Sequence, residues 1–488
     1  MERKTERNIL ILTFLIALGS RLAFIFRVPF FSSDGAYYNL RHAEHITHNL
    51  TPIIYDPLSY GGNLIINTHL FHYFLAIWDL VLSQGIVYKL LPAILASSIV
   101  IIVYVLAKQI TKDKYSALFG ALLAAFVPTY ISNTINQISV ISVYIPVLLL
   151  LLSALLAIKK SRKLFLLWSI ILVLLAPLNL LVLFTIVFFA ILTLSESVVL
   201  TRTEKEASVF FVVFFVLINI VLFRTLYFDQ SLAAIWQNLP LEVYGELFQN
   251  FNLFNTINLI GVVPLVFGIA GFILADKKNK SIILLKAVIL ADFTLLLLKL
   301  IPFQEGVLIL AVIFCIISAI TLKELIKYMH ITKVAKYTTL FVSLIVLVSV
   351  VSLIIPSTSL ALDVIEDGVT EGEIEAMGWI AQHTEEQATI AANINEGNMI
   401  LYLAKRANVI DTNFLYAENR ILDVEIIFTT QSLVLAKQAL DTYSVNYIYF
   451  SEKTKEFYGV EALTYTNDES CFKEIFNNEQ ATIYEVVC

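Results

Sequence analysis

Long apolar runs alternate with short polar segments through the first 355 residues of the chain. Most of these runs approach the roughly 20 residues that an α-helix needs to cross the hydrocarbon core of a bilayer. The stretch 69–84 is shorter and carries His69, His72 and Asp79, so we expect an interfacial or re-entrant helix there. The other runs predict eleven membrane spans, at about 9–27, 88–107, 115–131, 138–158, 164–176, 178–198, 208–223, 256–275, 281–298, 304–322 and 337–355.

Basic residues are distributed asymmetrically between the connections that join these runs. Every second connection carries a cluster of lysine and arginine, and the alternate connections do not. This alternation is the positive-inside pattern and predicts a cytoplasmic N-terminus. The long loop 28–87 and the C-terminal tail would then both lie on the outer side. No small-residue cleavage site follows the first run, so we expect that run to be retained as a span.

The tail, residues 356–488, differs from the rest of the chain in charge and in periodicity. It contains 22 acidic and 7 basic residues, whereas residues 1–355 contain 17 acidic and 26 basic ones. Helical and strand patterns alternate along it, which predicts a small α/β domain with parallel strands. We therefore expect a polytopic α-helical membrane domain, 1–355, and a C-terminal extracytoplasmic α/β domain, 356–488. The expected helices are 371–383, 398–405 and 431–443, and the expected strands are 389–394, 409–411 and 447–451.

The composition excludes several classes of protein. Apolar residues make up 58% of the chain and charged residues only 15%, with a mean hydropathy of +0.81. An ordinary soluble enzyme carries about a quarter charged residues, and a disordered chain is less apolar. The net charge of −6 argues against a nucleic-acid partner. Of the three cysteines, Cys471 and Cys488 would pair if the tail faces an oxidising space, and Cys315 lies in an apolar run.

The outer loop 28–87 holds most of the candidate chemistry. Five of the seven histidines lie in this loop. Its other ionisable candidates are Asp34, Tyr38, Arg41, Glu44 and Asp56. A carboxylate beside a membrane face, such as that of Asp34, can bind a divalent metal or accept a proton. The sequence Ser32-Ser33-Asp34 is equally good N-cap chemistry for the helix that follows, and both interpretations stay open.

His42, His45 and His48 recur every three residues, which places them near one face of a helix. As metal ligands they would need a partner from elsewhere in the fold, and the sequence specifies none. The spacing of cysteines and histidines in the rest of the chain does not suggest zinc either. Interfacial or structural histidines are therefore the favoured interpretation.

Two further groups of ionisable residues lie in other outer connections. Glu242 and Glu246 are spaced i, i+4 in the loop 224–255, so a helix would place both on one side. There they would either reach a metal or an acceptor, or form a solvated helix face. Lys299 lies at the outer end of a span, where a lysine either serves a lipid phosphate or snorkels to the interface.

Four stretches of the chain carry a family resemblance. The first outer loop contains DGAYYNLRHAEHITHN, YDPLSYGG and HLFHYF. The second and third spans contain LLPAILASSIVIIVYVLAKQ and ALFGALLAAFVPTYISNT, and a later outer loop contains PLEVYGE. The tail contains MGWIAQHTEEQATIAANINEGNMILYLAKRANVIDTN. Together these stretches resemble the catalytic subunit of membrane oligosaccharyltransferases, within the C-type glycosyltransferases that use polyprenyl-linked sugars.

The resemblance implies a glycosyltransferase of the cell membrane that uses a polyprenyl-phosphate or polyprenyl-pyrophosphate sugar donor and a protein or glycan acceptor. It implies that Asp34 positions a divalent metal, Mn²⁺ or Mg²⁺, or deprotonates the acceptor. Glu242 or Glu246 would complete the catalytic site from the opposite loop. A fixed cation stabilises the charge on a leaving phosphate. The implied donor-binding residues are Tyr38, Arg41, Asp56, His69, His72 and Lys299, and the implied acceptor-binding residues are Asn395, Glu396 and Gly397.

The chain also departs from the family pattern. The family's second acidic pair falls near Gln137 and Ser139, which lack a carboxylate. Its Trp-Trp-Asp-Tyr-Gly acceptor motif falls on residues 393–397, where only Gly397 matches, and its pyrophosphate-binding arginine falls near Pro302. A catalytically inactive relative that binds lipid-linked glycans is therefore the alternative. A transporter is less favoured, because we find no related halves and no paired charges within the spans.

Overall fold

The computed structural model describes residues 3–82, 84–230, 245, 247–249, 251–276, 278–413, 417 and 419–488. By compactness the chain forms two units. The first unit comprises residues 1–28, 85–222 and 244–366, and the second comprises 29–84, 223–243 and 367–488.

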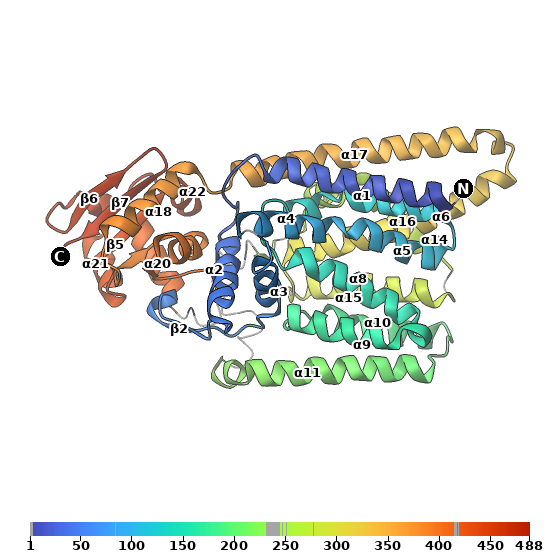
Figure 1. Cartoon of the computed structure of the whole chain (residues 1–488), viewed down its shortest axis with the longest axis horizontal. Helices are drawn as coiled ribbons and strands as arrows, with labels where there is room; N and C mark the ends of the chain where they lie inside the picture. Colours follow the sequence, from blue (N-terminus) through green and yellow to red (C-terminus); the bar gives the residue numbers. More distant parts are fainter. Residues whose placement is uncertain are drawn as a thin grey trace. The chain divides into compact units, whose positions relative to one another are not determined.

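The first unit is a helical bundle whose long helices run alongside one another (Figure 1). Each of the eleven apolar runs contains a helix, as expected. The helices are α1 (Arg3–Ile25), α4 (Gln84–Ser97), α5 (Ile99–Thr111), α6 (Lys114–Ala125), α7 (Pro128–Ser132), α8 (Ile141–Leu156), α9 (Ile158–Leu175), α10 (Leu181–Ser195), α11 (Arg202–Gln230), α13 (Leu253–Ile260), α14 (Val262–Leu274), α15 (Lys280–Leu297), α16 (Phe303–Ile331) and α17 (Thr338–Glu366).

Within the described residues, five helical stretches are long and apolar enough to cross a membrane. They begin at Lys4, Ile86, Arg202, Phe303 and Ala335. The pair α13 and α14, which bends by 96°, is either a broken sixth span or a re-entrant loop. The bend lies at Gly261, whose φ is +90°. Residues with a side chain rarely adopt this backbone conformation. The chain is therefore an integral membrane protein of the expected fold class, while the number of spans stays a prediction.

Small residues let the helices of this bundle approach closely. A Cβ atom added to Gly120 of α6 would lie 2.9 Å from the carbonyl oxygen of Cys315 in α16. One added to Gly268 of α14 would lie 2.5 Å from the ring of Phe314. Glycine at such contacts favours helix packing in a membrane, because van der Waals contact is the main attraction there. Helix α16 is accordingly the most buried of the candidate spans, with 83% of its apolar window inside the protein.

The second unit contains a five-stranded sheet in the order β4-β3-β5-β7-β6. Strands β3 (Thr389–Ala391), β4 (Ala407–Asn408) and β5 (Tyr447–Ser451) are parallel, and the hairpin of β6 (Phe472–Asn477) and β7 (Ala481–Val486) joins antiparallel through β7. Helices α18 (Glu371–His383), α20 (Arg420–Thr429), α21 (Leu433–Thr442) and α22 (Glu452–Tyr458) accompany the sheet. The predicted α/β domain and its parallel pairing are confirmed.

Some elements of this sheet differ from the expected ones. The helix 371–383 and the strand 447–451 occur as predicted. The strand expected at 409–411 lies instead at Ala407–Asn408, since Asp411 turns its side chain toward Ser59 and Asn408. The β6–β7 hairpin was not predicted. A disulfide between Cys471 and Cys488 ties its two ends together.

The first outer loop belongs to the same compact unit as the tail. It forms α2 (Asp34–Asn49), β1 (Tyr55–Asp56), β2 (Asn63–Leu64) and α3 (Leu70–Asp79). The backbone N–H of Tyr60 donates to the Asn408 side chain at 2.9 Å, and its hydroxyl donates to the carbonyl of Asp411 at 2.9 Å. Helix α3 has 10 residues, so it is too short to cross a core about 30 Å thick, as expected for 69–84.

Candidate active site

Asp34 joins the first outer loop to the tail. Its carboxylate accepts a hydrogen bond from the Asn398 side chain at 2.7 Å and one from the backbone N–H of Met399 at 2.8 Å. These donors begin the short helical segment formed by α19 (Gly397–Met399) and the π-helical turn Ile400–Ala404. Ser33, the N-cap of α2, makes no side-chain cap bond. Asp34 therefore caps a helix of the tail rather than its own.

Gly397 makes this arrangement possible. A Cβ atom at this position would lie 2.2 Å from the carbonyl oxygen of Ile410 and 2.7 Å from the Cβ of Asp411. Only glycine lets the segment that begins at residue 397 approach the chain after β4 so closely. Gly397, the one residue that matches the family's acceptor motif, is thus buried, and it permits this close backbone contact.

A pocket of about 300 Å³ opens beside Asp34. Two of the three predicted acceptor-binding residues, Asn395 and Glu396, line it together with Asp34. These residues come from two of the stretches that carry the family resemblance. The full lining is Ser32, Ser33, Asp34, Gly35, Asp367, Val369, Asn395, Glu396, Met399, Thr412 and Lys453.

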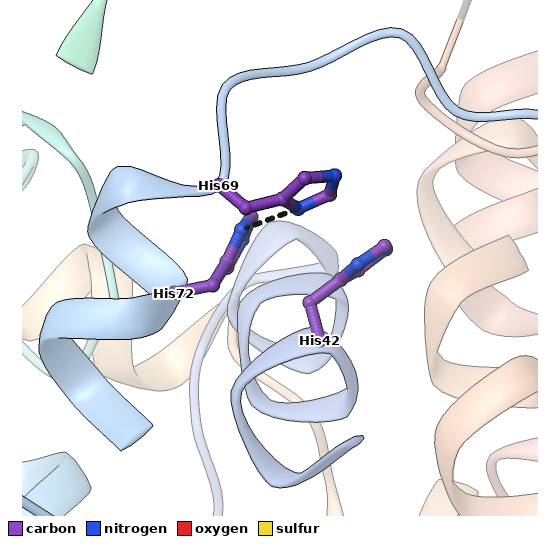
Figure 2. Close-up of side chains that lie close together, drawn as sticks. All are labelled: His42, His69 and His72. Atoms are coloured by element: carbon purple, nitrogen blue, oxygen red, sulfur yellow. Dashed lines mark hydrogen bonds between the residues drawn. The ribbon is translucent and has the colours of Figure 1, made fainter. Parts of the chain in front are cut away.

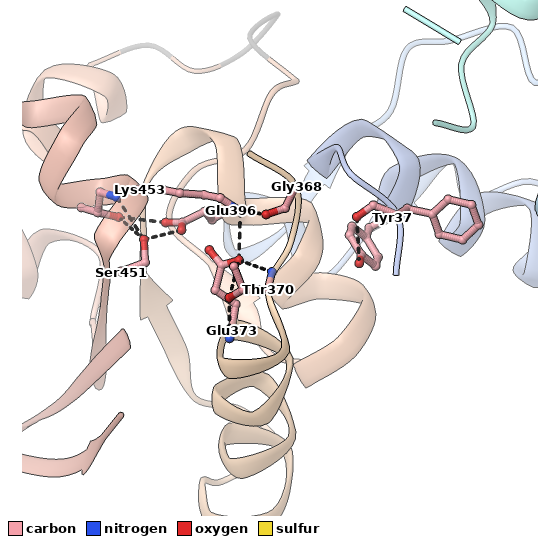
Figure 3. Close-up of polar contacts among 9 residues, drawn as sticks. Tyr37, Gly368, Thr370, Glu373, Glu396, Ser451 and Lys453 are labelled. Atoms are coloured by element: carbon pink, nitrogen blue, oxygen red, sulfur yellow. Dashed lines mark hydrogen bonds and ion pairs between the residues drawn. The ribbon is translucent and has the colours of Figure 1, made fainter. Parts of the chain in front are cut away.

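Glu396 and Lys453 are held in place by their own partners at the pocket (Figure 3). The buried carboxylate of Glu396 accepts hydrogen bonds from Ser451 at 2.5 Å and from Thr454 at 2.8 Å. The ammonium of Lys453 pairs with Glu373 at 2.9 Å. The pocket thus combines buried carboxyl groups with one positioned cation.

Burial changes the proton affinity of both pocket carboxyls. Desolvation raises the pKa of Asp34 to about 7, although the hydrogen bonds from Asn398 and Met399 act in the opposite direction. It also raises the pKa of Glu396 to about 7, against the hydrogen bonds from Ser451 and Thr454. A carboxyl that titrates near neutral pH is suited to accept and release a proton.

Arg41 is oriented by Asp56, another residue for which the family resemblance implies a role in donor binding. The two side chains form a bidentate ion pair, in which Nη2 donates to Oδ1 at 2.7 Å and Nη1 donates to Oδ2. The backbone N–H of Leu58 also donates to Asp56, at 3.0 Å. Such two-pronged pairing fixes the plane of the guanidinium. The roles of both residues in donor binding stay predictions.

Three histidines of the first loop cluster, but they are not the three expected to share a helix face. His42 of α2 lies against His69 and His72 at the start of α3 (Figure 2). His45 instead faces Asn49, one turn along the same helix. Tyr38, a predicted donor-binding residue, packs against His42 with ring centroids 4.3 Å apart and ring planes tilted by 46°.

The structure does not test the remaining predicted site residues. Glu242 and Glu246 lie outside the described residues. Lys299 belongs to the first unit, as do Gln137 and Ser139. Over the described parts of the chain, Asp34 does not belong to any group of three histidine, cysteine or acidic side chains that could share an ion. A metal at Asp34 therefore stays a prediction.

Sequence reasoning missed Lys453, Ser451 and Thr454. All three lie where β5 passes into α22, and Ser451 caps that helix by accepting a hydrogen bond from the backbone N–H of Thr454. The carboxyl end of a parallel strand followed by a capped helix is a common place for a binding site. That signal was available in the residues Ser-Glu-Lys-Thr after the predicted strand.

No family model and no curated protein matches the chain. Solved structures do match it. The oligosaccharyltransferase of Archaeoglobus fulgidus, tethered to an acceptor peptide with the NVT sequon, is 14% identical, with a TM-score of 0.71 over 100% of this chain and 74% of that one. ArnT from Cupriavidus metallidurans, bound to undecaprenyl phosphate, is 9% identical, with a TM-score of 0.59 over 100% and 99%. The arabinofuranosyltransferase AftD from Mycobacteria is 14% identical, with a TM-score of 0.56 over 100% and 42%. The chain therefore has the fold of the C-type membrane glycosyltransferases.

Proposed function

We propose that this chain, which has the fold of the C-type membrane glycosyltransferases, transfers a sugar or oligosaccharide from a polyprenyl-phosphate or polyprenyl-pyrophosphate donor to a protein or glycan acceptor. The reaction would take place at the outer face of the cell membrane. Solved relatives of the fold have been described with dolichol-phosphate and with undecaprenyl phosphate. The disulfide between Cys471 and Cys488 favours an oxidising, extracytoplasmic location for the tail.

The pocket at Asp34 is the observation that carries this proposal. Asp34 and Asn398 are 364 positions apart in the sequence, yet their side chains are hydrogen-bonded. The bond brings the polar start of the first loop to residues 395–397, where the resemblance locates the acceptor. A structural cap alone needs neither an adjoining cavity nor a second buried carboxyl with a pKa near 7.

In the proposed reaction, a nucleophilic oxygen or nitrogen of the acceptor attacks the anomeric carbon of the donor sugar. The bond between that carbon and the phosphate oxygen breaks, and the lipid phosphate leaves with the electron pair. The acceptor's proton passes to the carboxylate of Asp34. The guanidinium of Arg41, oriented by Asp56, would stabilise the charge that develops on the leaving phosphate.

No step of the proposed reaction uses the divalent metal that the resemblance implies. Each oxygen of Asp34 already accepts a hydrogen bond, and among the described residues Asp34 does not belong to a group of three side chains that could share an ion. Glu242 and Glu246 remain the sequence's candidates to complete a metal site. The Archaeoglobus protein has been solved with Zn and sulfate. A requirement for Mn²⁺ or Mg²⁺ is therefore tested directly in the experiment below.

The alternative is an inactive relative that binds lipid-linked glycans. The capping contact of Asp34 with Met399 favours it, since such a contact can be purely structural. The lack of a carboxylate at Gln137 and Ser139 favours it as well. An inactive protein would bind the donor without releasing lipid phosphate.

The test is donor binding and turnover measured together. The full chain, purified in detergent, receives labelled polyprenyl-linked sugar and acceptor extract, with Mn²⁺ or with a chelator. We expect release of lipid phosphate to fall by about 10²–10⁴-fold in Asp34→Asn, the range for loss of a general base. Glu44→Gln, on the same helix but outside the pocket, is the matched control. Full release by Asp34→Asn, or donor binding without release by the wild type, would overturn the proposal.

A further inference from the structure

His42, His69 and His72 form a compact cluster between helices α2 and α3 (Figure 2). The Nδ1 atoms of His69 and His72 are 3.3 Å apart. One ring nitrogen from each of the three residues lies within 4.8 Å of the other two. Ligands bound to one tetrahedral ion about 2.0–2.1 Å away are separated by about 3.3 Å. The pair His69–His72 already has this separation.

His42 is the strongest sign that the cluster has a ligand. Its side chain is only 1% exposed, yet neither ring nitrogen has a hydrogen-bond partner within the described protein. Buried polar groups in native proteins are nearly always paired, so an unpaired imidazole requires an explanation. An ion between the three rings would satisfy one of these nitrogens.

The surroundings prepare His72 to act as a ligand. Its Nε2 lies 2.8 Å from the Oδ1 of Asn39, so Nε2–H donates to that oxygen and leaves the lone pair on Nδ1 facing the cluster. A hydrogen bond of this kind behind a ligand histidine fixes its tautomer and orients the ring.

Burial disfavours protonation of the three rings, and unprotonated imidazole is the form that binds metals. Burial lowers the pKa of His42 well below its ordinary value, lowers that of His69, and lowers that of His72 to about 3. Arg41, the neighbouring cation, is already paired with Asp56.

We propose that His42, His69 and His72 bind a transition-metal ion of the Zn²⁺ class at a site separate from the Asp34 pocket. Three imidazole nitrogens suit Zn²⁺, Co²⁺, Ni²⁺ or Cu²⁺, whereas Mg²⁺ and Mn²⁺ prefer oxygen ligands. Through the described residues the cluster contains three such ligands and not a fourth, which leaves a coordination position open. His69 is partly exposed, so a water or an anionic oxygen can reach that position from its side. The ion would hold the start of α3 against α2.

The test measures metal content and does not depend on the transfer reaction. The full chain is purified in detergent with an affinity tag that lacks histidine, stripped with a chelator, and dialysed against Zn²⁺ or Co²⁺. We expect one Zn²⁺ per chain by elemental analysis and the visible absorption of four-coordinate Co²⁺. His42→Asn, His69→Asn and His72→Asn should each weaken binding at least tenfold. His48→Asn, an exposed histidine of the same helix, is the control and should bind as the wild type does.

Thermal unfolding separates a lost ligand from a lost fold. Zn²⁺ should raise the Tm of the wild type and of His48→Asn, and should leave that of the three cluster variants unchanged. His69 is the least buried of the three. If the other two variants fail to fold, Zn²⁺ binding by His69→Asn decides the test. A wild type that retains no Zn²⁺ overturns the proposal, and so does Zn²⁺ binding that survives all three substitutions. Equal affinity for Mg²⁺ would overturn the assigned metal class.

Discussion

Replacing Asp34 with asparagine should stabilise the protein while it slows transfer. Asparagine keeps the shape of the side chain and one acceptor oxygen for the backbone N–H of Met399. The side-chain amide of Asn398 can flip so that its Oδ1 accepts a hydrogen bond from the new NH₂ group. That oxygen is buried without a partner among the described residues. The substitution therefore removes the negative charge and leaves the contact largely intact.

The size of the stabilisation follows from the pKa. Burial raises the pKa of Asp34 from 3.8 to about 7, so ionising it in the folded protein costs about 4 kcal/mol. This cost is absent below the unfolded-state pKa, grows as the pH rises, and is complete above the folded-state pKa. Stability should thus fall by about 2 kcal/mol between about pH 5.5 and about pH 8 on account of this carboxyl. Asp34→Asn should remove that part of the slope.

Thermal unfolding of the detergent-solubilised protein across this pH range measures the effect. Glu396 contributes a slope of the same sign, because its pKa is also raised to about 7. The quantity to compare is therefore the difference in Tm between Asp34→Asn and the wild type, which should widen as the pH rises. Transfer by the wild type should rise through about pH 7 as Asp34 loses its proton. A pH-independent difference, or a variant less stable than the wild type at about pH 8, would refute this account of Asp34.

Three further substitutions test the supporting structure. Arg41→Lys keeps the positive charge but loses the bidentate contact with the carboxylate of Asp56. The initial rate of transfer should fall by about tenfold. The free energy of unfolding, measured with denaturant, should fall by about 1–3 kcal/mol. Gly397→Ala places a methyl group against the carbonyl of Ile410 and should lower the free energy of unfolding by about 1–3 kcal/mol. Its control is Gly378→Ala on α18, where the added methyl group meets open space and should not destabilise the protein. Equal Tm values for the two variants would contradict the packing argument. Cys471→Ser opens a disulfide that spans 17 positions and should cost about 3 kcal/mol, and a reductant should lower the Tm of the wild type alone.

The sequence predicted the helices of the first unit and the elements 371–383 and 447–451 because each has a strong local pattern. It did not predict the hairpin of β6 and β7. Only the first of the six residues of β6 is buried, so the strand lacks the apolar periodicity that marks a strand in a sequence. Pairing with β7 makes it a strand, and that pairing is a tertiary contact.

The sequence by itself determined that the chain enters a membrane, that its tail is an α/β domain, and that Asp34 begins a helix with polar chemistry around it. These properties follow from composition, periodicity and capping residues, which act over a few positions. Only the tertiary structure decided which helix Asp34 caps and which histidines meet. His42 lies beside His69 and His72 rather than with His45 and His48, because the packing of α3 on α2 outweighs spacing along one helix. Contacts between distant residues depend on how whole elements pack, and local patterns do not contain that information.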